Sequence, residues 1–192
     1  MNLREHSQTD ELLRQRNICG WNNTPEYIAA WLKSMEAGSN YLFWIKPTSQ
    51  PDLRAGHISL NSEYDPPFLD VDDKSVLKIA TLFILPEYRG GGIARAAVET
   101  IEQYAVTEPY GSKHCRAIVI NAVSRKYSEE DEWRADYFRM TGFEPKPRGA
   151  SNEDWYARMG YVTYREEPTY PAHRGPKDRK LWAVFMRKEL QS

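Results

Sequence analysis

The sequence predicts an α/β fold with a mixed, mostly antiparallel central sheet flanked by helices. Apolar segments of strand length alternate with amphipathic helical segments, which is typical of α/β proteins. Loops separate two pairs of successive strands, which indicates hairpins rather than an all-parallel sheet. The chain has 192 residues, of which 41% are apolar and 28% charged. This size and composition fit one globular domain spanning residues 1–192.

The N-terminal third predicts a helix followed by a hairpin. Residues 1–20 are polar and mixed in charge, so we expect a flexible or helical extension there and no signal peptide. Residues 25–37 predict a helix that Thr24 can cap. Residues 41–45 and 54–61 predict two antiparallel strands separated by a proline-containing loop.

The middle of the chain carries the strongest apolar segments. Residues 75–85 form a strongly apolar run of the length expected for a central strand. Residues 93–105 place their apolar side chains on one helical face, and residues 115–123 predict another buried strand.

The C-terminal part predicts two short helices and a final pair of strands. Ser128 and Asp131 have capping-box spacing for a helix over 129–140. Asn152 is expected to cap a second short helix that ends at Gly160. The final strands are predicted at 161–167 and 181–190, on either side of a loop rich in proline and charge.

Three consecutive glycines, Gly90, Gly91 and Gly92, lie between the central strand and the helix that follows it. Glycine lets backbone N–H groups approach an anion closely, and a helix N-terminus adds partial positive charge. Arg89 adds a full positive charge. The Lys-Ser/Thr pair of a P-loop is missing, and the glycine spacing differs from the dinucleotide fingerprint. The glycines alone leave a turn that binds nothing as an alternative.

The longer segment LPEYRGGGIARAAVETIE, residues 85–102, resembles the acetyl-CoA signature of the GNAT N-acetyltransferase superfamily. The core pattern of that signature is Gln/Arg-x-x-Gly-x-Gly/Ala, matched here by Arg89, Gly92 and Ala94. The segment NEDWYARMGYVTY, residues 152–164, resembles the second motif of the family. Both motifs occur in the family's order, and the resemblance covers roughly residues 25–188.

The resemblance implies a sheet with splayed central strands and a set of coenzyme contacts. Backbone groups of the strand before the glycines would face the pantetheine arm, and backbone N–H groups of the turn would hold the pyrophosphate. The site residues so assigned are Phe83, Ile84, Leu85, Arg89, Gly90, Gly91, Gly92, Ile93, Ala94, Asn152 and Tyr156.

Two segments compete for the second motif, and they differ four residues before the glycine. The first, residues 137–143, has Phe138 there, and the second, residues 155–161, has Tyr156. Only a tyrosine hydroxyl can donate a hydrogen bond to the leaving thiolate. Pro145 and Pro147 also disfavour a strand after the first segment. We therefore assign Tyr156 as the proton donor, which makes residues 124–150 an insertion.

The general base has no clear signal, because residues 75–85 contain no carboxylate. Glu63, Asp65 and Asp70 belong to an acidic segment next to the acceptor cleft implied by the resemblance, and Glu63 is our candidate. We expect His57 and Cys115 to be packed structural residues.

The resulting hypothesis is an enzyme that transfers the acetyl group of acetyl-CoA to a primary amine by direct attack. A small-molecule acceptor is favoured, because five carboxylates in residues 61–73 and several aromatic residues suit a cationic or aromatic amine. Protein N-terminal or lysine acetylation is the alternative within the class, and a non-catalytic coenzyme A-binding module is the alternative outside it.

Composition narrows the other partners. The formal net charge of −1 and the lack of a basic stripe disfavour nucleic acid, and no apolar run could span a membrane. The four histidines show no metal-ligand spacing, so no metal is expected. The two cysteines form no disulfide framework, which favours the cytoplasm. A monomer or a homodimer is expected.

Overall fold

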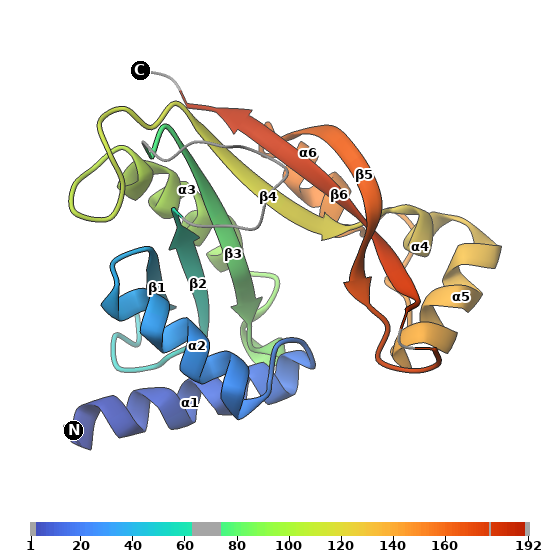
Figure 1. Cartoon of the computed structure of the whole chain (residues 1–192), viewed down its shortest axis with the longest axis horizontal. Coiled ribbons are helices and arrows are strands. Elements are labelled where there is room, and N and C mark those ends of the chain that lie inside the picture. Colours follow the sequence, from blue (N-terminus) through green and yellow to red (C-terminus); the bar gives the residue numbers. More distant parts are fainter. Residues whose placement is uncertain (1–2, 63–73, 177, 191–192) are drawn as a thin grey trace. The chain divides into compact units, whose positions relative to one another are not determined.

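A computed structural model describes residues 3–62, 74–176 and 178–190 of the chain (Figure 1). Its strands form a six-stranded sheet with the order β1-β2-β3-β4-β6-β5. Backbone contacts divide the chain into two compact units. The first extends to Ile118 and includes Leu190, and the second comprises Val119–Glu189.

The first unit begins with two helices, α1 (Leu3–Cys19) and α2 (Pro25–Glu36). The predicted cap of α2 is confirmed, because the Thr24 hydroxyl accepts a hydrogen bond from the Tyr27 N–H at 3.2 Å. Apolar residues of α1, α2 and the first strand join in one core cluster. Its buried members are Leu12, Ile28 and Trp31, and its partly buried members are Leu13, Leu32, Leu42 and Trp44.

Three antiparallel strands follow: β1 (Asn40–Ile45), β2 (Gly56–Asn61) and β3 (Val76–Ile84). The β2–β3 register shifts by one residue between His57 and Ser59, and Thr81 on β3 has φ +53°. This irregularity is a β-bulge, which bends a strand and is common near functional sites. A Cβ atom on Gly56 would lie 2.2 Å from the Phe83 carbonyl oxygen, so only glycine fits where β2 meets the end of β3.

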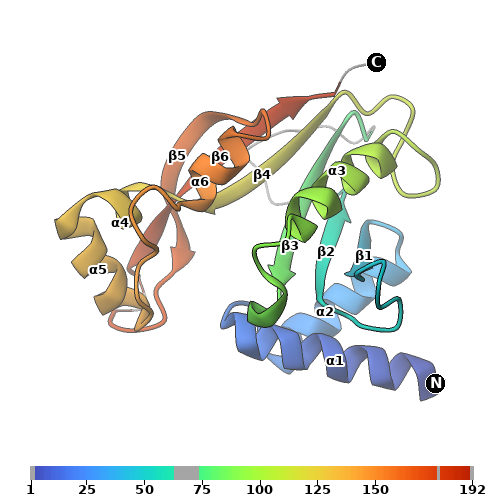
Figure 2. The same ribbon diagram turned by 180° about the vertical axis from the view of Figure 1, so that it is seen from behind.

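A short 3-10 helix, η1 (Pro86–Tyr88), and the helix α3 (Ile93–Ala105) follow β3. The buried face of α3, with Val98, Ile101 and Ala105, agrees with the predicted apolar stripe. Helix α2 lies in front of the strands in Figure 1, and α3 lies in front of them in Figure 2, which shows the reverse view. The two helices therefore cover opposite faces of this part of the sheet.

The second unit contains most of β4 and the remaining elements. These are β4 (Ala117–Val123), α4 (Lys126–Glu129), α5 (Asp131–Thr141), α6 (Asn152–Ala157), β5 (Val162–Pro171) and β6 (Lys180–Glu189). Strands β5 and β6 form the predicted antiparallel hairpin. Among the described helices, none is long and apolar enough to cross a membrane.

Two helix caps in the second unit differ from the predictions. Ser128 lies inside α4, two residues before the N-cap position of α5, and its hydroxyl donates to the Arg125 carbonyl at 2.9 Å. The N-cap of α5 is Glu130, whose side chain makes no capping bond. The N-cap of α6 is Ser151, whose hydroxyl oxygen accepts from the Asp154 N–H at 2.9 Å, and Asn152 is the first helical residue. The predicted capping box and the Asn152 cap are therefore wrong.

Candidate active site

The glycine turn places a row of backbone amides at the N-terminus of α3. Gly90 and Gly92 have φ of +95° and +77°, a conformation that glycine adopts without strain. Among the described residues, the backbone N–H groups of Gly90, Gly91, Gly92, Ile93 and Ala94 have no hydrogen-bond acceptor. The first amides of any helix lack intrahelical acceptors. Here the turn adds further free amides to them, and free backbone amides at a helix N-terminus are the kind of donors that bind anions.

Gly91 differs from Gly90 and Gly92 because its backbone conformation does not require a glycine. Its φ lies outside the left-handed region in which Gly90 and Gly92 are found. A Cβ atom built on any of the three would meet nothing within 4 Å, so the turn faces open space. Neither backbone conformation nor packing within the described residues explains a glycine at position 91. The close approach of a ligand to the backbone would explain it.

Arg89 is held against the strand that precedes the turn. Its Nε donates to the Ile84 carbonyl at 2.9 Å, and its guanidinium carbon lies 5.7 Å from the centre of the Phe83 ring. The Leu85 N–H is also engaged, because it donates to the Ala55 carbonyl at 2.9 Å. Phe83, Ile84 and Leu85 are all buried core residues. Two of the backbone groups assigned to the pantetheine arm are thus already paired within the chain.

A pocket of about 510 Å³ lies beside the end of β3 in the first unit. Its lining combines carboxylates with arginines and one aromatic side chain: Glu11, Arg14, Asp52, Leu53, Arg54, Leu85, Glu87 and Tyr88. Glu11 pairs with Arg14 through two contacts of 2.8 Å, and this bond lowers the pKa of the Glu11 carboxyl. Helix α1, which the sequence predicted only as an extension, therefore supplies one wall of the pocket.

His57 is fully buried in a polar network between α1 and β2. Gln15 Nε2 donates to Glu11 Oε1 at 2.7 Å and to the Arg54 carbonyl at 2.9 Å. The Gln15 oxygen must therefore face His57 Nδ1, 2.8 Å away, which makes Nδ1 the donor. His57 Nε2 then faces Arg16 Nη1 at 3.5 Å as an acceptor.

This network keeps the His57 imidazole neutral. Burial lowers the pKa of His57 to about 3, and the positive charge of Arg16 contributes to the shift. His57 is therefore a packed residue, as the sequence predicted. Cys115 is packed as well, because its buried thiol donates to the Ala117 carbonyl at 3.5 Å and burial raises its pKa.

Tyr156 lies on α6 in the second unit. The residue is 8% exposed, and its ring packs edge-on against Trp155 and Tyr161, with centroid distances of 4.8 and 5.6 Å. Burial raises the pKa of the Tyr156 hydroxyl above its ordinary value, so this group stays protonated at neutral pH. Among the described residues, no group forms a hydrogen bond with the Tyr156 hydroxyl. The hydroxyl is thus a buried, neutral donor.

The remaining predicted residues have other positions. Asn152 is exposed, and its side-chain oxygen accepts a hydrogen bond from Lys146 Nζ. Glu63 and the other carboxylates between residues 63 and 73 lie outside the described residues. Two of the aromatic residues that suggested an aromatic or cationic acceptor also have partners in the structure: Trp31 is buried in the core cluster, and the Arg54 guanidinium lies 4.8 Å from the centre of the Trp44 ring. Within the described residues, no cluster of three or more His, Cys, Asp or Glu side chains is placed to hold a metal ion.

Comparison with known proteins assigns the family. Residues 7–130 match the model of the acetyltransferase (GNAT) family. The chain belongs to the GNAT acetyltransferase family. This membership makes the protein an acyltransferase and agrees with the predicted fold. No curated protein sequence gives a significant match.

Solved structures with the GNAT fold resemble the whole chain at low sequence identity. An aminoglycoside 6'-N-acetyltransferase complexed with coenzyme A has a TM-score of 0.63 and 11% identity, covering 100% of this chain and 96% of that one. NAA60 from Arabidopsis thaliana, in complex with a bisubstrate analogue, has a TM-score of 0.60 and 14% identity. The match covers 96% of this chain and 95% of that one. The spermidine/spermine N-acetyltransferase SpeG from Vibrio cholerae has a TM-score of 0.57 and 13% identity. The match covers 95% of this chain and 87% of that one. At these identities the likeness shows the fold alone.

Several residues of this region were not found from the sequence. Gln15 and Glu11 reach β2 and the pocket from a helix whose mixed charge pattern gave no sign of a buried polar face. Arg125 contacts Glu153 and Asp154 across the insertion. Glu153 and Asp154 lie in the first turn of α6, where acidic side chains are ordinarily explained by the helix dipole. The sequence therefore gave no sign that they contact Arg125.

Proposed function

We propose that this GNAT protein is an N-acetyltransferase that transfers the acetyl group of acetyl-CoA to a primary amine. The observation that carries the proposal is the run of five free backbone amides from Gly90 to Ala94, with a glycine at position 91 that the fold itself does not require. Such a run fits the pyrophosphate of coenzyme A, because several N–H groups and a helix N-terminus converge on one anion. In this proposal Arg89 stabilises the strand end through Ile84 and presents its remaining guanidinium donors beside the turn.

The proposed reaction is direct attack of a neutral amine on a thioester. Acetyl-CoA supplies the thioester, so a C–N bond forms as the C–S bond breaks. An amine with a pKa of about 10.4 must lose a proton, which at pH 7 costs about 4.6 kcal/mol. We propose that Glu63 or a water chain leading to it accepts this proton. Tyr156 donates a hydrogen bond to the leaving sulfur, for which its buried and protonated hydroxyl is suited.

We further propose that the acceptor is a small-molecule amine. The pocket beside Leu85, Glu87 and Tyr88 has a volume of about 510 Å³, within the range of small-ligand sites. Among the described residues, Asp52 and Glu87 make no hydrogen bond and no close ion pair, although the charge of Glu87 interacts with that of Arg14. Asp52 is therefore the pocket carboxylate that we assign to a cationic group of the acceptor. Acetylation of a protein N-terminus or lysine is the alternative. A cytoplasmic location and a monomeric or homodimeric state remain part of the proposal.

The test is thiol release from acetyl-CoA with spermidine, kanamycin, an arylamine, free amino acids and short peptides as acceptors. We expect turnover with at least one small amine and weaker turnover with peptides. Turnover with peptides alone would favour the alternative acceptor. If acetyl-CoA binds but no amine in the panel is acetylated, the protein is a coenzyme-binding module.

The role of Tyr156 is tested in the same assay with Tyr156→Phe. We expect kcat to fall about 100-fold, at the low end of general-acid effects, with acetyl-CoA affinity unchanged. Retention of full activity would overturn the assignment of Tyr156 as the donor.

A further inference from the structure

The helix that carries Tyr156 is too short to fix its own position. Helix α6 contains six residues, Asn152–Ala157. Isolated helices of fewer than about 12 residues are marginal in water, so contacts outside the helix must hold it in place. Those contacts decide where the hydroxyl of Tyr156 points.

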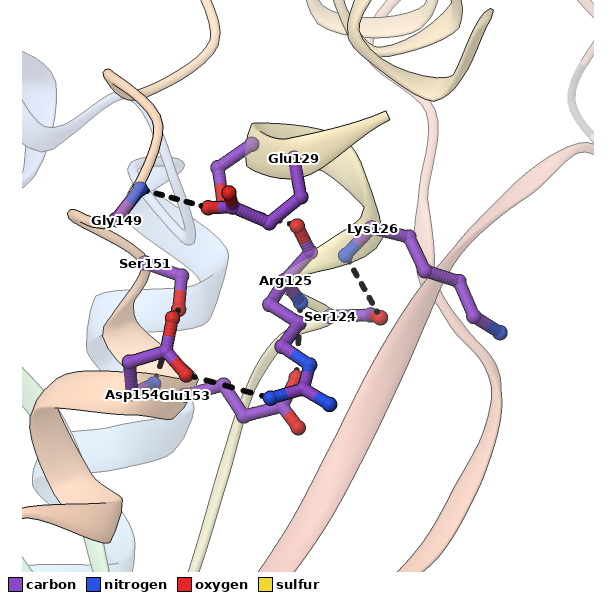
Figure 3. A network of polar contacts seen from close by, with 9 residues as sticks. Ser124, Arg125, Lys126, Glu129, Gly149, Ser151, Glu153 and Asp154 are labelled. Atoms are coloured by element: carbon purple, nitrogen blue, oxygen red, sulfur yellow. Dashed lines mark hydrogen bonds and ion pairs between the residues drawn. The ribbon is translucent and has the colours of Figure 1, made fainter. Parts of the chain in front are cut away.

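The first turn of α6 is bonded to Arg125, the N-cap residue of α4 (Figure 3). The Arg125 N–H donates to Glu153 Oε2 at 2.8 Å, and Arg125 Nη1 lies 3.6 Å from Asp154 Oδ1. Asp154 also accepts from the Ser151 hydroxyl at 2.6 Å, which joins the ion pair to the helix cap. The charge-assisted bond to Glu153 is the shorter link, and it involves a backbone donor whose position is fixed by the chain.

The segment entering α6 is held at the other end of α4. Glu129 Oε1 accepts a hydrogen bond from the Gly149 N–H at 2.8 Å. Figure 3 shows Glu129 reaching Gly149 while Arg125 faces Glu153 and Asp154. Helix α4 therefore contacts the loop before α6 through Glu129, and its N-cap residue, Arg125, contacts the first turn of α6.

Helix α4 is in turn anchored to the backbone of β6. The Ser124 N–H donates to the Trp182 carbonyl at 3.0 Å, and the Trp182 N–H donates to the Tyr127 hydroxyl at 3.1 Å. Both backbone groups of Trp182 thus bond to residues outside β5.

Pro168 of β5 is the residue opposite Trp182 in the β5–β6 register. Proline has no N–H to donate, but because the backbone of Trp182 points away from β5, no hydrogen bond between the two strands is lost at this pair. Lys126 Nζ adds a bond of 3.0 Å to Glu166 of β5.

We infer that Glu153 is a positioning residue, which through Arg125 fixes α6, and with it the Tyr156 hydroxyl, relative to the β5–β6 hairpin. The inference rests on the proposed role of Tyr156. It gives the inserted segment 124–150 a function, which is to hold the helix that carries Tyr156. A displacement of about 1 Å at a reacting group can lower a rate about 100-fold, so losing this link affects kcat more than coenzyme binding.

The experiment compares Glu153→Ala with Glu153→Gln and a control, Glu132→Ala. The Gln side chain keeps an oxygen that can accept from the Arg125 N–H. Glu132 is an exposed carboxylate on α5, and among the described residues it has no bonded partner. Each variant is assayed with the panel amine of highest turnover, or by thiol release from acetyl-CoA alone if no amine reacts. Hydrogen exchange of residues 152–160 is measured on the same proteins.

We expect Glu153→Ala to lower kcat about tenfold with the KM for acetyl-CoA changed less than twofold, and to speed amide exchange in 152–160. Glu153→Gln and Glu132→Ala should stay within about twofold of the unmodified protein in kcat. In a Tyr156→Phe background, Glu153→Ala should have little further effect, because the two residues act through one group.

The outcomes separate this inference from the proposed function. If Tyr156→Phe is fully active, the proposed role of Tyr156 fails. If Tyr156→Phe is slow but the Glu153→Ala effect multiplies with it, Glu153 acts elsewhere and the inference is wrong. Unchanged kcat and unchanged exchange in Glu153→Ala would also overturn it.

Discussion

Replacing Gly91 with alanine should separate coenzyme binding from folding. The φ of Gly91 lies outside the left-handed region, and a Cβ atom there meets nothing within 4 Å. Gly91→Ala should therefore leave stability unchanged or raise it by about 0.4–1 kcal/mol, since alanine restricts the unfolded chain. Gly92 has φ +77°, and Gly92→Ala should cost about 1–2 kcal/mol. For a chain of this length, each kcal/mol corresponds to about 2–4 °C in Tm.

The effect on binding should run the other way. A methyl group on Gly91 would stand where a pyrophosphate approaches the free amides, and we expect at least a tenfold loss of affinity, about 1.4 kcal/mol. Acetyl-CoA at 100 times its Kd should stabilise the unmodified protein by about 2.7 kcal/mol. At the same concentration, a tenfold weaker variant gains about 1.4 kcal/mol, so its Tm shift should be about half.

The assay is thermal unfolding of the unmodified protein, Gly91→Ala and Gly92→Ala, each with and without acetyl-CoA. A Gly91→Ala protein with unaltered stability and an undiminished acetyl-CoA shift would refute the placement of the pyrophosphate against this turn. A loss of stability in Gly91→Ala without ligand would show instead that the fold requires this glycine.

Two further predictions concern the first unit. The pKa of His57 is about 3 in the folded protein and about 6.5 in the unfolded chain. As the pH falls below 6.5, the His57 imidazole therefore binds a proton only in the unfolded chain, which favours unfolding. By pH 4.5 this should lower the free energy of unfolding by about 2.7 kcal/mol. Urea unfolding as a function of pH checks this, and an equally steep drop in a folded His57→Gln variant would assign it to other groups. Gly56→Ala would bring a Cβ atom to 2.2 Å from the Phe83 carbonyl oxygen, so it should cost about 3 kcal/mol. Its urea midpoint measures this, and an unaltered midpoint would mean that β2 can shift away from β3 without loss.

Elements with strong local signals were predicted well from the sequence. The helix over 93–105 has both a regular apolar face and a glycine turn before it, and its predicted bounds agree with α3. Pro145 and Pro147 indicated that no strand follows Gly142, and the structure has none between residues 143 and 151. These features depend on neighbouring residues, so periodicity and backbone chemistry suffice to find them.

Features that depend on distant residues were not predicted. His57 meets Gln15 across 42 positions, and Arg125 meets Glu153 across 28. The capping box failed because Ser128 is part of the short helix α4 and does not occupy the N-cap position of α5. Rules based on residue spacing consider only the backbone a few residues away from a side chain. They cannot show which residues from distant parts of the sequence the fold brings next to it.

The buried polar face of α1 has a consequence for handling the protein. Trimming the chain to residues 25–188, the part that resembles the family motifs, would leave His57 without its Gln15 acceptor and uncover Ile28 and Trp31, which pack with Leu12. The shortened protein would then expose an apolar surface and tend to aggregate. Affinity tags and fusion partners should therefore be joined with α1 left intact.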